Sequence, residues 1–171
     1  MIPEFSTFGF VGSLTGNTIF TAGQNIYRLF FDGTGSWSLG DDLTGGSIQV
    51  YRGSFSSNSH NINLENFSAN GINNAINVDF GNSTINISEN YVAFSPHLSI
   101  SSANANLVFS GTVSTLYCQI NDVATFDSVT VNHYTYFYGT LTCNTFTSTS
   151  GVRLNNIITG NAYFHRSFTG L

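Results

Sequence analysis

Short runs in which apolar and polar residues alternate recur along most of the chain. In a typical run, Ile76, Val78 and Phe80 are separated by single polar residues. A spacing of two is typical of a β-strand with one buried face, and the runs end at Gly, Asn or Ser residues, which favour turns. No window of useful length shows the i, i+3, i+4 spacing of an amphipathic helix. The pattern therefore predicts an all-β fold.

The alternating runs also repeat at a longer, nearly constant interval. Two series of apolar residues show it: Ile62, Ile85, Leu107, Val129 and Val152, and Ile76, Leu98, Ile120, Leu141 and Tyr163. Successive members are 22 or 23 residues apart in the first series and 21 or 22 in the second. A fixed period in the range of roughly 20–50 residues indicates a stacked repeat architecture.

We therefore predict a single-domain parallel β-helix, or solenoid, with about 22 residues per coil. Each coil would stack on the previous one at about 4.8 Å, so that each series forms an inward column. The alternative is a jelly roll or a β-sandwich, which also consists of many short strands. A sandwich, however, has no physical reason to keep a constant period.

The two ends fit the period less well than the middle. We expect residues 1–17 to form an N-terminal arm or cap, residues 18–160 the solenoid, and residues 161–171 a C-terminal cap. Both ends are rich in aromatic residues and off the period, as terminal repeats often are.

Composition narrows the classes of partner. Only 8% of the residues are charged, and the net charge is −5 with four Lys plus Arg. A nucleic-acid-binding protein needs a basic surface, and attraction to anionic lipid needs basic residues as well. We expect neither nucleic acid nor a membrane as a partner.

Several segments have a familiar composition: FGNSTINIS, ANANLVFSGTVSTLYC, ATFDSVTVN and GTLTCNTFTSTSG. They resemble the Thr/Ser/Asn/Gly-rich β-solenoid repeats of phage tail fibre, tailspike or capsid-decorating proteins and of bacterial surface adhesins. The resemblance covers residues 45–155 approximately. It implies a non-enzymatic structural or attachment protein on a virion surface, or otherwise extracellular, often trimeric. The alternatives are a bacterial extracellular adhesin or matrix protein and, third, a polysaccharide-active glycosidase.

A glycosidase would need a pair of carboxylates. Asp79 is expected to point outward, and Asp122 follows 43 residues later, about two coils on. Two coils separate them by roughly 10 Å, whereas inverting glycosidases hold their carboxyl groups about 6.5–9.5 Å apart. Scattered acids on a regular lattice often produce such a pair, so we expect no enzyme activity. The four histidines form no metal-ligand spacing, and we expect no metal and no cofactor.

The aromatic run at residues 134–138 is the strongest indication of a binding surface. Tyr134, Tyr136 and Tyr138 share one strand face, and Phe137 lies on the other. Two interpretations remain open: a tyrosine ladder against a neighbouring turn, or a face covered by another subunit or a glycan. We expect a homo-oligomer, preferably a trimer, with other virion or surface proteins and a host glycan as further candidate partners.

The two cysteines form no metal or redox motif. Cys118 and Cys143 are 25 residues apart, close to one coil. We expect them on neighbouring coils as thiols without a bridge, with a disulfide as the alternative.

Overall fold

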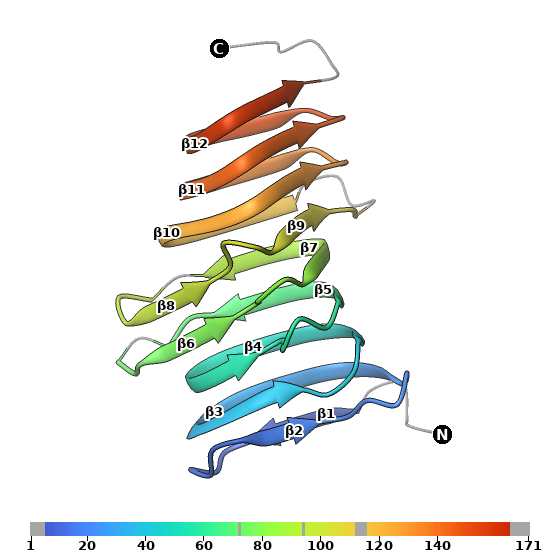
Figure 1. Cartoon of the computed structure of the whole chain (residues 1–171), viewed down its shortest axis with the longest axis vertical. Helices are drawn as coiled ribbons and strands as arrows, with labels where there is room; N and C mark the ends of the chain where they lie inside the picture. The colour runs from blue at the N-terminus through green and yellow to red at the C-terminus, as the bar shows by residue number, and fades with distance from the viewer. Residues whose placement is uncertain (1–5, 72, 94, 112–115, 165–171) are drawn as a thin grey trace.

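The chain folds as a parallel β-solenoid of about seven turns with about 20 residues per coil. We describe it from a computed structural model, in which the strands stack from the N-terminal end to the C-terminal end (Figure 1). The structure describes the backbone of residues 6–71, 73–93, 95–111 and 116–164, and the side chains of these residues except 116–123, 154–159 and 162–164. The all-β prediction and the solenoid prediction are confirmed.

All pairings between the described strands are parallel. The strands are β1 (Thr7–Phe10), β2 (Asn17–Ile19), β3 (Asn25–Leu39), β4 (Leu43–Ser56), β5 (Ile62–Ala69), β6 (Ile76–Asp79), β7 (Thr84–Ala93), β8 (Leu98–Ser101), β9 (Asn106–Phe109), β10 (Leu116–Val131), β11 (Thr135–Ser148) and β12 (Val152–Phe164). Because strands pair with strands of neighbouring coils, the backbone hydrogen bonds run along the stack.

Each coil contributes three strand segments, which we call sides 1, 2 and 3. In the coil of β5 and β6, side 1 is residues 62–64, side 2 is residues 66–69 and side 3 is residues 76–79. Side 1 pairs with the start of β4 and the start of β7. Side 2 pairs with the following segments of the same two strands, whereas side 3 pairs with the end of β4 and with β8. Equivalent residues of successive coils therefore lie in columns.

The first predicted column is correct for four of its five members. Ile62 pairs with Ile85, Ile85 with Leu107, and Leu107 with Val129. The prediction for Val152 is wrong, because Val129 pairs with Phe146 and Val152 pairs with Thr135. In the β5–β6 coil, residues 70–75 connect side 2 to side 3. In β11 one continuous strand covers all three sides, so this coil is shorter.

The second predicted column is correct only at its first step. Ile76 pairs with Leu98, as expected. Ile120 instead pairs with Ala93 and Gly139, which are on side 2. The remaining members are separated as well: Leu141 pairs with Ala124 and Ile157, and Tyr163 pairs with Thr147. A constant period therefore holds for the middle coils alone.

Strand pairing extends into both predicted ends. β1 lies within residues 1–17 and pairs with β3, and β12 continues to Phe164 in pairing with β11. Residues 1–5 and 165–171 of the predicted caps lie outside the described part of the chain.

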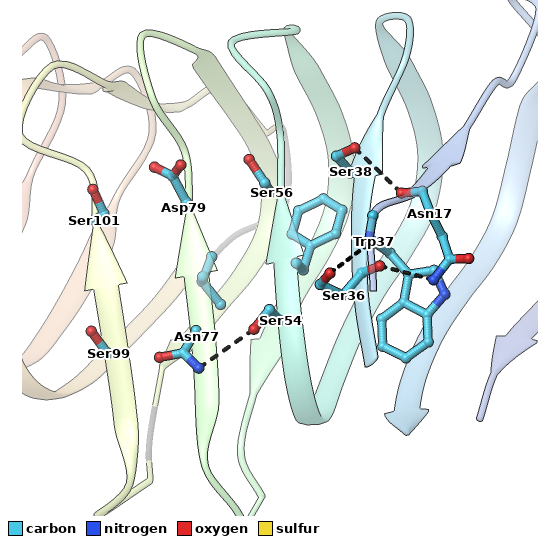
Figure 2. Close-up of a pocket in the computed structure, with 13 residues that line it drawn as sticks. Asn17, Ser36, Trp37, Ser38, Ser54, Ser56, Asn77, Asp79, Ser99 and Ser101 are labelled. Atoms are coloured by element: carbon cyan, nitrogen blue, oxygen red, sulfur yellow. Dashed lines mark hydrogen bonds between the residues drawn. The ribbon is translucent and has the colours of Figure 1, made fainter. Parts of the chain in front are cut away.

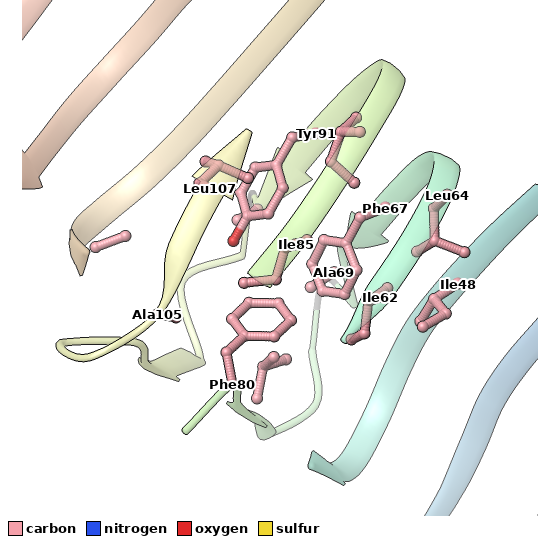
Figure 3. Packing of buried hydrophobic residues seen from close by; sticks show 14 of the residues in the cluster. Ile48, Ile62, Leu64, Phe67, Ala69, Phe80, Ile85, Tyr91, Ala105 and Leu107 are labelled. Carbon is pink, nitrogen blue, oxygen red and sulfur yellow. The ribbon is translucent and has the colours of Figure 1, made fainter. Parts of the chain in front are cut away.

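The interior of the solenoid is filled with aliphatic and aromatic side chains. Alternate residues point inward, so that Ile76, Val78 and Phe80 are at most 2% exposed, as the alternation predicted. Phe67 packs against Phe80 and Tyr91 at ring-centroid distances of 5.4 and 5.1 Å. Figure 3 shows these three rings together with the aliphatic residues around them. Burial of this apolar surface is the main stabilising term of the stack.

Buried serines hold the corner between side 3 and side 1. Ser57 Oγ donates to the carbonyl of Phe80 over 2.8 Å, across to the next coil. Ser83, the equivalent residue of that coil, lies with its Oγ 2.7 Å from Ser57 Oγ and 2.5 Å from the His60 carbonyl oxygen. These hydroxyls connect the turns of successive coils by hydrogen bonds in the buried interior.

Candidate binding surfaces

A shallow groove with a volume of about 370 Å³ runs along side 3, and most of the residues that line it are Ser, Asn or Asp. Its outer surface carries two columns of short side chains: Ser36, Ser54, Asn77 and Ser99 in one, and Ser38, Ser56, Asp79 and Ser101 in the other. Figure 2 shows these side chains at corresponding positions of successive strands. We call this surface the hydroxyl groove.

The groove exists because side 3 alternates strictly. In each of the four coils that carry the groove, one apolar residue separates two outward polar residues, as Phe55 separates Ser54 from Ser56. Parallel pairing then places Ser54 beside Asn77 and Ser56 beside Asp79. The spacing is about 4.8 Å between coils and about twice the strand rise of 3.3 Å within a coil.

Within the groove, Ser36 accepts two hydrogen bonds, from the Gly16 backbone N–H at its Oγ over 2.9 Å and from Asn17 Nδ2 at its carbonyl over 3.0 Å. Asn77 Nδ2 donates to Ser54 Oγ over 3.4 Å, and Ser38 Oγ donates to the Asn17 carbonyl over 3.3 Å. The Asp79 carboxylate accepts the Gly81 backbone N–H at 3.0 Å, which orients it at the edge of the groove. Among the described lining residues Asp79 is the only charged one. The surface therefore offers mainly neutral donors and acceptors.

Of the two carboxylates in the predicted pair, Asp79 and Asp122, the structure describes the side chain of Asp79 only. Asp79 is exposed and points outward, as predicted. The Asp122 side chain lies outside the described residues, and its backbone falls at a register irregularity between Ile120 and Ala124. The pairing of the two carboxylates stays a prediction.

The second candidate surface is on side 2 and consists of Tyr134, Tyr136, Tyr138 and Arg153, which we call the tyrosine patch. Tyr134 and Tyr138 are each 37% exposed, whereas Phe137 is 2% exposed, so the predicted division of faces is confirmed. The Tyr136 ring lies 5.1 Å from the Tyr134 ring and 6.4 Å from the Tyr138 ring. The three rings form one continuous aromatic surface.

A cation completes the tyrosine patch. The guanidinium carbon of Arg153 lies 5.9 Å from the centroid of the Tyr136 ring, within the range of a cation–π contact. A hydrogen bond with Tyr136 raises the pKa of Tyr134 above its ordinary value of 10.0. The Tyr134 phenol therefore stays neutral at physiological pH. Whether another subunit, a glycan or a turn covers the patch stays a prediction.

The cysteines lie on neighbouring coils and on different sides. The backbone of Cys118 pairs with Phe137 on side 2, whereas Cys143 pairs with Phe126 and Thr159. Cys143 is buried at 2% exposure. The Cys118 side chain lies outside the described residues, so the expected thiol state stays a prediction.

Acidic residues form a polar turn between β3 and β4. The Asp41 carboxylate accepts the backbone N–H groups of Thr21 and Ala22 at 2.7 and 2.6 Å. Asp42 accepts the backbone N–H of Asn61 at 2.8 Å and lies 3.6 Å from His60 Nδ1. Across the described residues, no group of three or more His, Cys, Asp or Glu could hold a metal ion.

Asp41 should contribute stability that depends on pH. The hydrogen bond from the Thr21 backbone, followed by that from Ala22, lowers the pKa of Asp41 below its ordinary value of 3.8. Because the folded-state pKa is lowered, the contribution is present above the unfolded-state pKa and is lost as the pH falls through the folded-state pKa.

We therefore expect the difference in unfolding free energy between the wild type and Asp41→Asn to shrink on acidification from pH 6 to below pH 3. Urea unfolding at several pH values measures it. A difference that stays constant over this range would contradict the assignment. Asp127→Asn, another exposed acid, for which no such backbone hydrogen bonds occur among the described contacts, is the control.

The hydroxyl groove was missed by reasoning from sequence, although a signal for it exists. Four tripeptides with the pattern polar–apolar–polar stand on side 3: Ser36-Trp37-Ser38, Ser54-Phe55-Ser56, Asn77-Val78-Asp79 and Ser99-Ile100-Ser101. Their spacing varies between 18 and 23 residues, so a search for a fixed period does not align them.

Comparison of the chain with protein-family models, with curated proteins and with solved structures found no match. Among the described residues, no helix has the length and apolar character to cross a membrane.

Proposed function

We propose that this chain is a non-enzymatic structural or attachment module on a virion surface. The observation that carries the proposal is the stack itself: a rigid apolar core holds neutral polar side chains in repeated columns on its outside. Such a surface suits repeated weak contacts with another large surface. The Thr/Ser/Asn/Gly-rich repeats of residues 45–155 support the same conclusion through their resemblance to phage fibre and decoration proteins.

The chemistry of the groove supports binding over catalysis. Hydrolysis of a glycoside commonly requires two carboxyl groups in fixed positions. Asp79 is the only carboxylate among the described residues that line the hydroxyl groove, and it is exposed. One ordinary exposed carboxylate can accept hydrogen bonds from a ligand without acting as an acid–base pair.

Labelling of particles tests the location. An antibody against the recombinant chain should decorate the surface of virions that encode it, in immunogold electron micrographs. Label confined to the outer surface of bacterial cells would contradict the virion role and favour the alternative of an adhesin. Release of reducing ends from polysaccharides by the purified chain would contradict the non-enzymatic part.

We further propose that the tyrosine patch is a subunit contact of a homo-oligomer, with a trimer preferred. Two rings at 37% exposure beside an arginine form the kind of aromatic and Arg-rich surface that interfaces favour. Closed symmetry would cover the same patch on each copy.

The substitution Tyr136→Asp should therefore disrupt assembly. Tyr136 is the central ring, and a carboxylate at its position would have to be buried in the contact. Light scattering should show a loss of the oligomer, and circular dichroism should show an unchanged β signal. Tyr51→Asp, at a tyrosine of 36% exposure outside the patch, should assemble normally. A wild-type chain that is a monodisperse monomer at micromolar concentration would refute the proposal.

A further inference from the structure

We propose that the hydroxyl groove is a binding site for a neutral polysaccharide, whose chain lies along the axis of the stack. This goes beyond the structural role proposed above and does not depend on a virion location.

The middle strands of side 3, which carry Ser54, Ser56, Asn77 and Asp79, have no free edge for a peptide strand. The segment at residues 53–56 pairs with β3 on one side and with β6 on the other, and β6 pairs in turn with β8. A peptide that adds a strand needs an unpaired edge. Recognition on this side must therefore come from the side chains.

Those side chains match a polyhydroxylated ligand. Serine hydroxyls and the Asn77 amide each donate and accept hydrogen bonds, and so do the hydroxyl groups of a sugar. Four successive coils present them in two columns, at steps of about 4.8 Å. A ligand with hydroxyl groups at regular intervals can use corresponding positions on each coil. Ser99 and Ser101, both exposed, continue the columns beyond Asn77 and Asp79.

The groove is also hollowed, with a volume of about 370 Å³, and it is lined along its length by these polar groups. The apolar residues between the columns, such as Phe55 and Val78, are buried at 1% and 2% exposure. Phe55 and Val78 are therefore not exposed as anchors for a lipid or a hydrophobic peptide.

Charge selects among polysaccharides. The lining contains Asp79 and, among the described residues, no Arg, Lys or His. A polyanionic chain would meet a like charge without a compensating cation. A neutral chain can instead donate its hydroxyl groups to the Asp79 carboxylate, in charge-assisted hydrogen bonds. The site therefore favours a neutral polymer over one built of uronic acids.

Affinity electrophoresis of the full chain tests the inference. The probes are four neutral polysaccharides (dextran, mannan, galactan and xylan) and polygalacturonate as the anionic counterpart. At least one neutral polymer should retard the wild type, and polygalacturonate should not. Ser54→Trp, which fills the centre of the groove, should weaken the retardation at least ten-fold. Asn77→Ala should weaken it about three- to ten-fold, since it removes hydrogen bonds with a neutral ligand.

Matched variants separate binding from folding. Thr130→Trp places the same large side chain at a half-buried position of side 1, outside the groove, and should bind as the wild type does. The inference is overturned if none of the neutral polymers retards the wild type, or if polygalacturonate retards it more strongly than they do. It is also overturned if Ser54→Trp is retarded as strongly as the wild type, provided that Ser54→Trp and Thr130→Trp keep the wild-type β signal in circular dichroism. Immunogold label on virions together with no retardation would leave the proposed virion role standing and remove this site.

Discussion

Replacement of Phe67 by alanine is expected to lower the free energy of unfolding by about 3–5 kcal/mol. Phe67 is 1% exposed, and its ring lies between Phe80 and Tyr91 in the interior. Its strand partners, Ile48 and Tyr91, are held by pairing with both neighbouring coils, so the backbone cannot collapse into the space that the ring leaves. We therefore expect no relaxation around the cavity that would reduce this loss of unfolding free energy.

Urea unfolding followed by the fluorescence of Trp37, the single tryptophan, measures this loss. Trp37 is 5% exposed in the folded chain, so its emission should shift when the core opens. Ser68→Ala, at the outward neighbour of Phe67, should change the free energy by less than about 0.5 kcal/mol. A Phe67→Ala chain that unfolds within 1 kcal/mol of the wild type would show that the stack relaxes around the cavity.

Alanine at Gly53 is expected to cost at least about 2 kcal/mol, for two reasons that add. Gly53 has a φ of 82°, a conformation that residues with a Cβ rarely adopt. In addition, a Cβ there would lie 2.7 Å from the carbonyl oxygen of Gly35 and closer still to that of Gly33. Both atoms belong to the backbone of the preceding coil, which cannot move without breaking its pairing with β4.

Two further substitutions separate these causes. Gly12→Ala places a Cβ in open space at a position without positive φ, and it should be neutral or slightly stabilising. Gly53→Asn keeps the steric clash but tolerates the positive φ. We expect Gly53→Asn to be nearly as destabilised as Gly53→Ala. If its unfolding midpoint in urea equals that of the wild type, the contact with the preceding coil does not restrict this position.

The alternation of residues was sufficient to predict the strands and their inward faces. Ile76, Val78 and Phe80 point inward and Asp79 points outward, because the strand geometry leaves no other arrangement with one buried face. Phe137 was likewise placed opposite the tyrosines from its position alone. These properties are local, since they depend on the pleat of a single strand.

The stacking of coils was predictable where the coil length is constant. Ile62, Ile85 and Leu107 align as expected, because their connecting segments have nearly equal lengths. Val152 does not continue this column, because the later coils have no loop between sides 2 and 3. The alternation of apolar and polar residues within a strand is the same whether or not a loop separates sides 2 and 3. The register between coils is therefore set by pairing with the neighbouring coil and cannot be derived from the alternation.

The two candidate sites also differ in how much of each could be predicted from the sequence. The sequence by itself determined that Tyr134, Tyr136 and Tyr138 share one face, whereas the contact of Arg153 with Tyr136 depends on the shortened coil that brings them into register. The hydroxyl groove was decided wholly by the tertiary structure. Its serines alternate in each strand, but they become two columns only when coils of unequal length stack in parallel. The stacking depends on burial of the apolar residues between them, which the neighbouring coils provide.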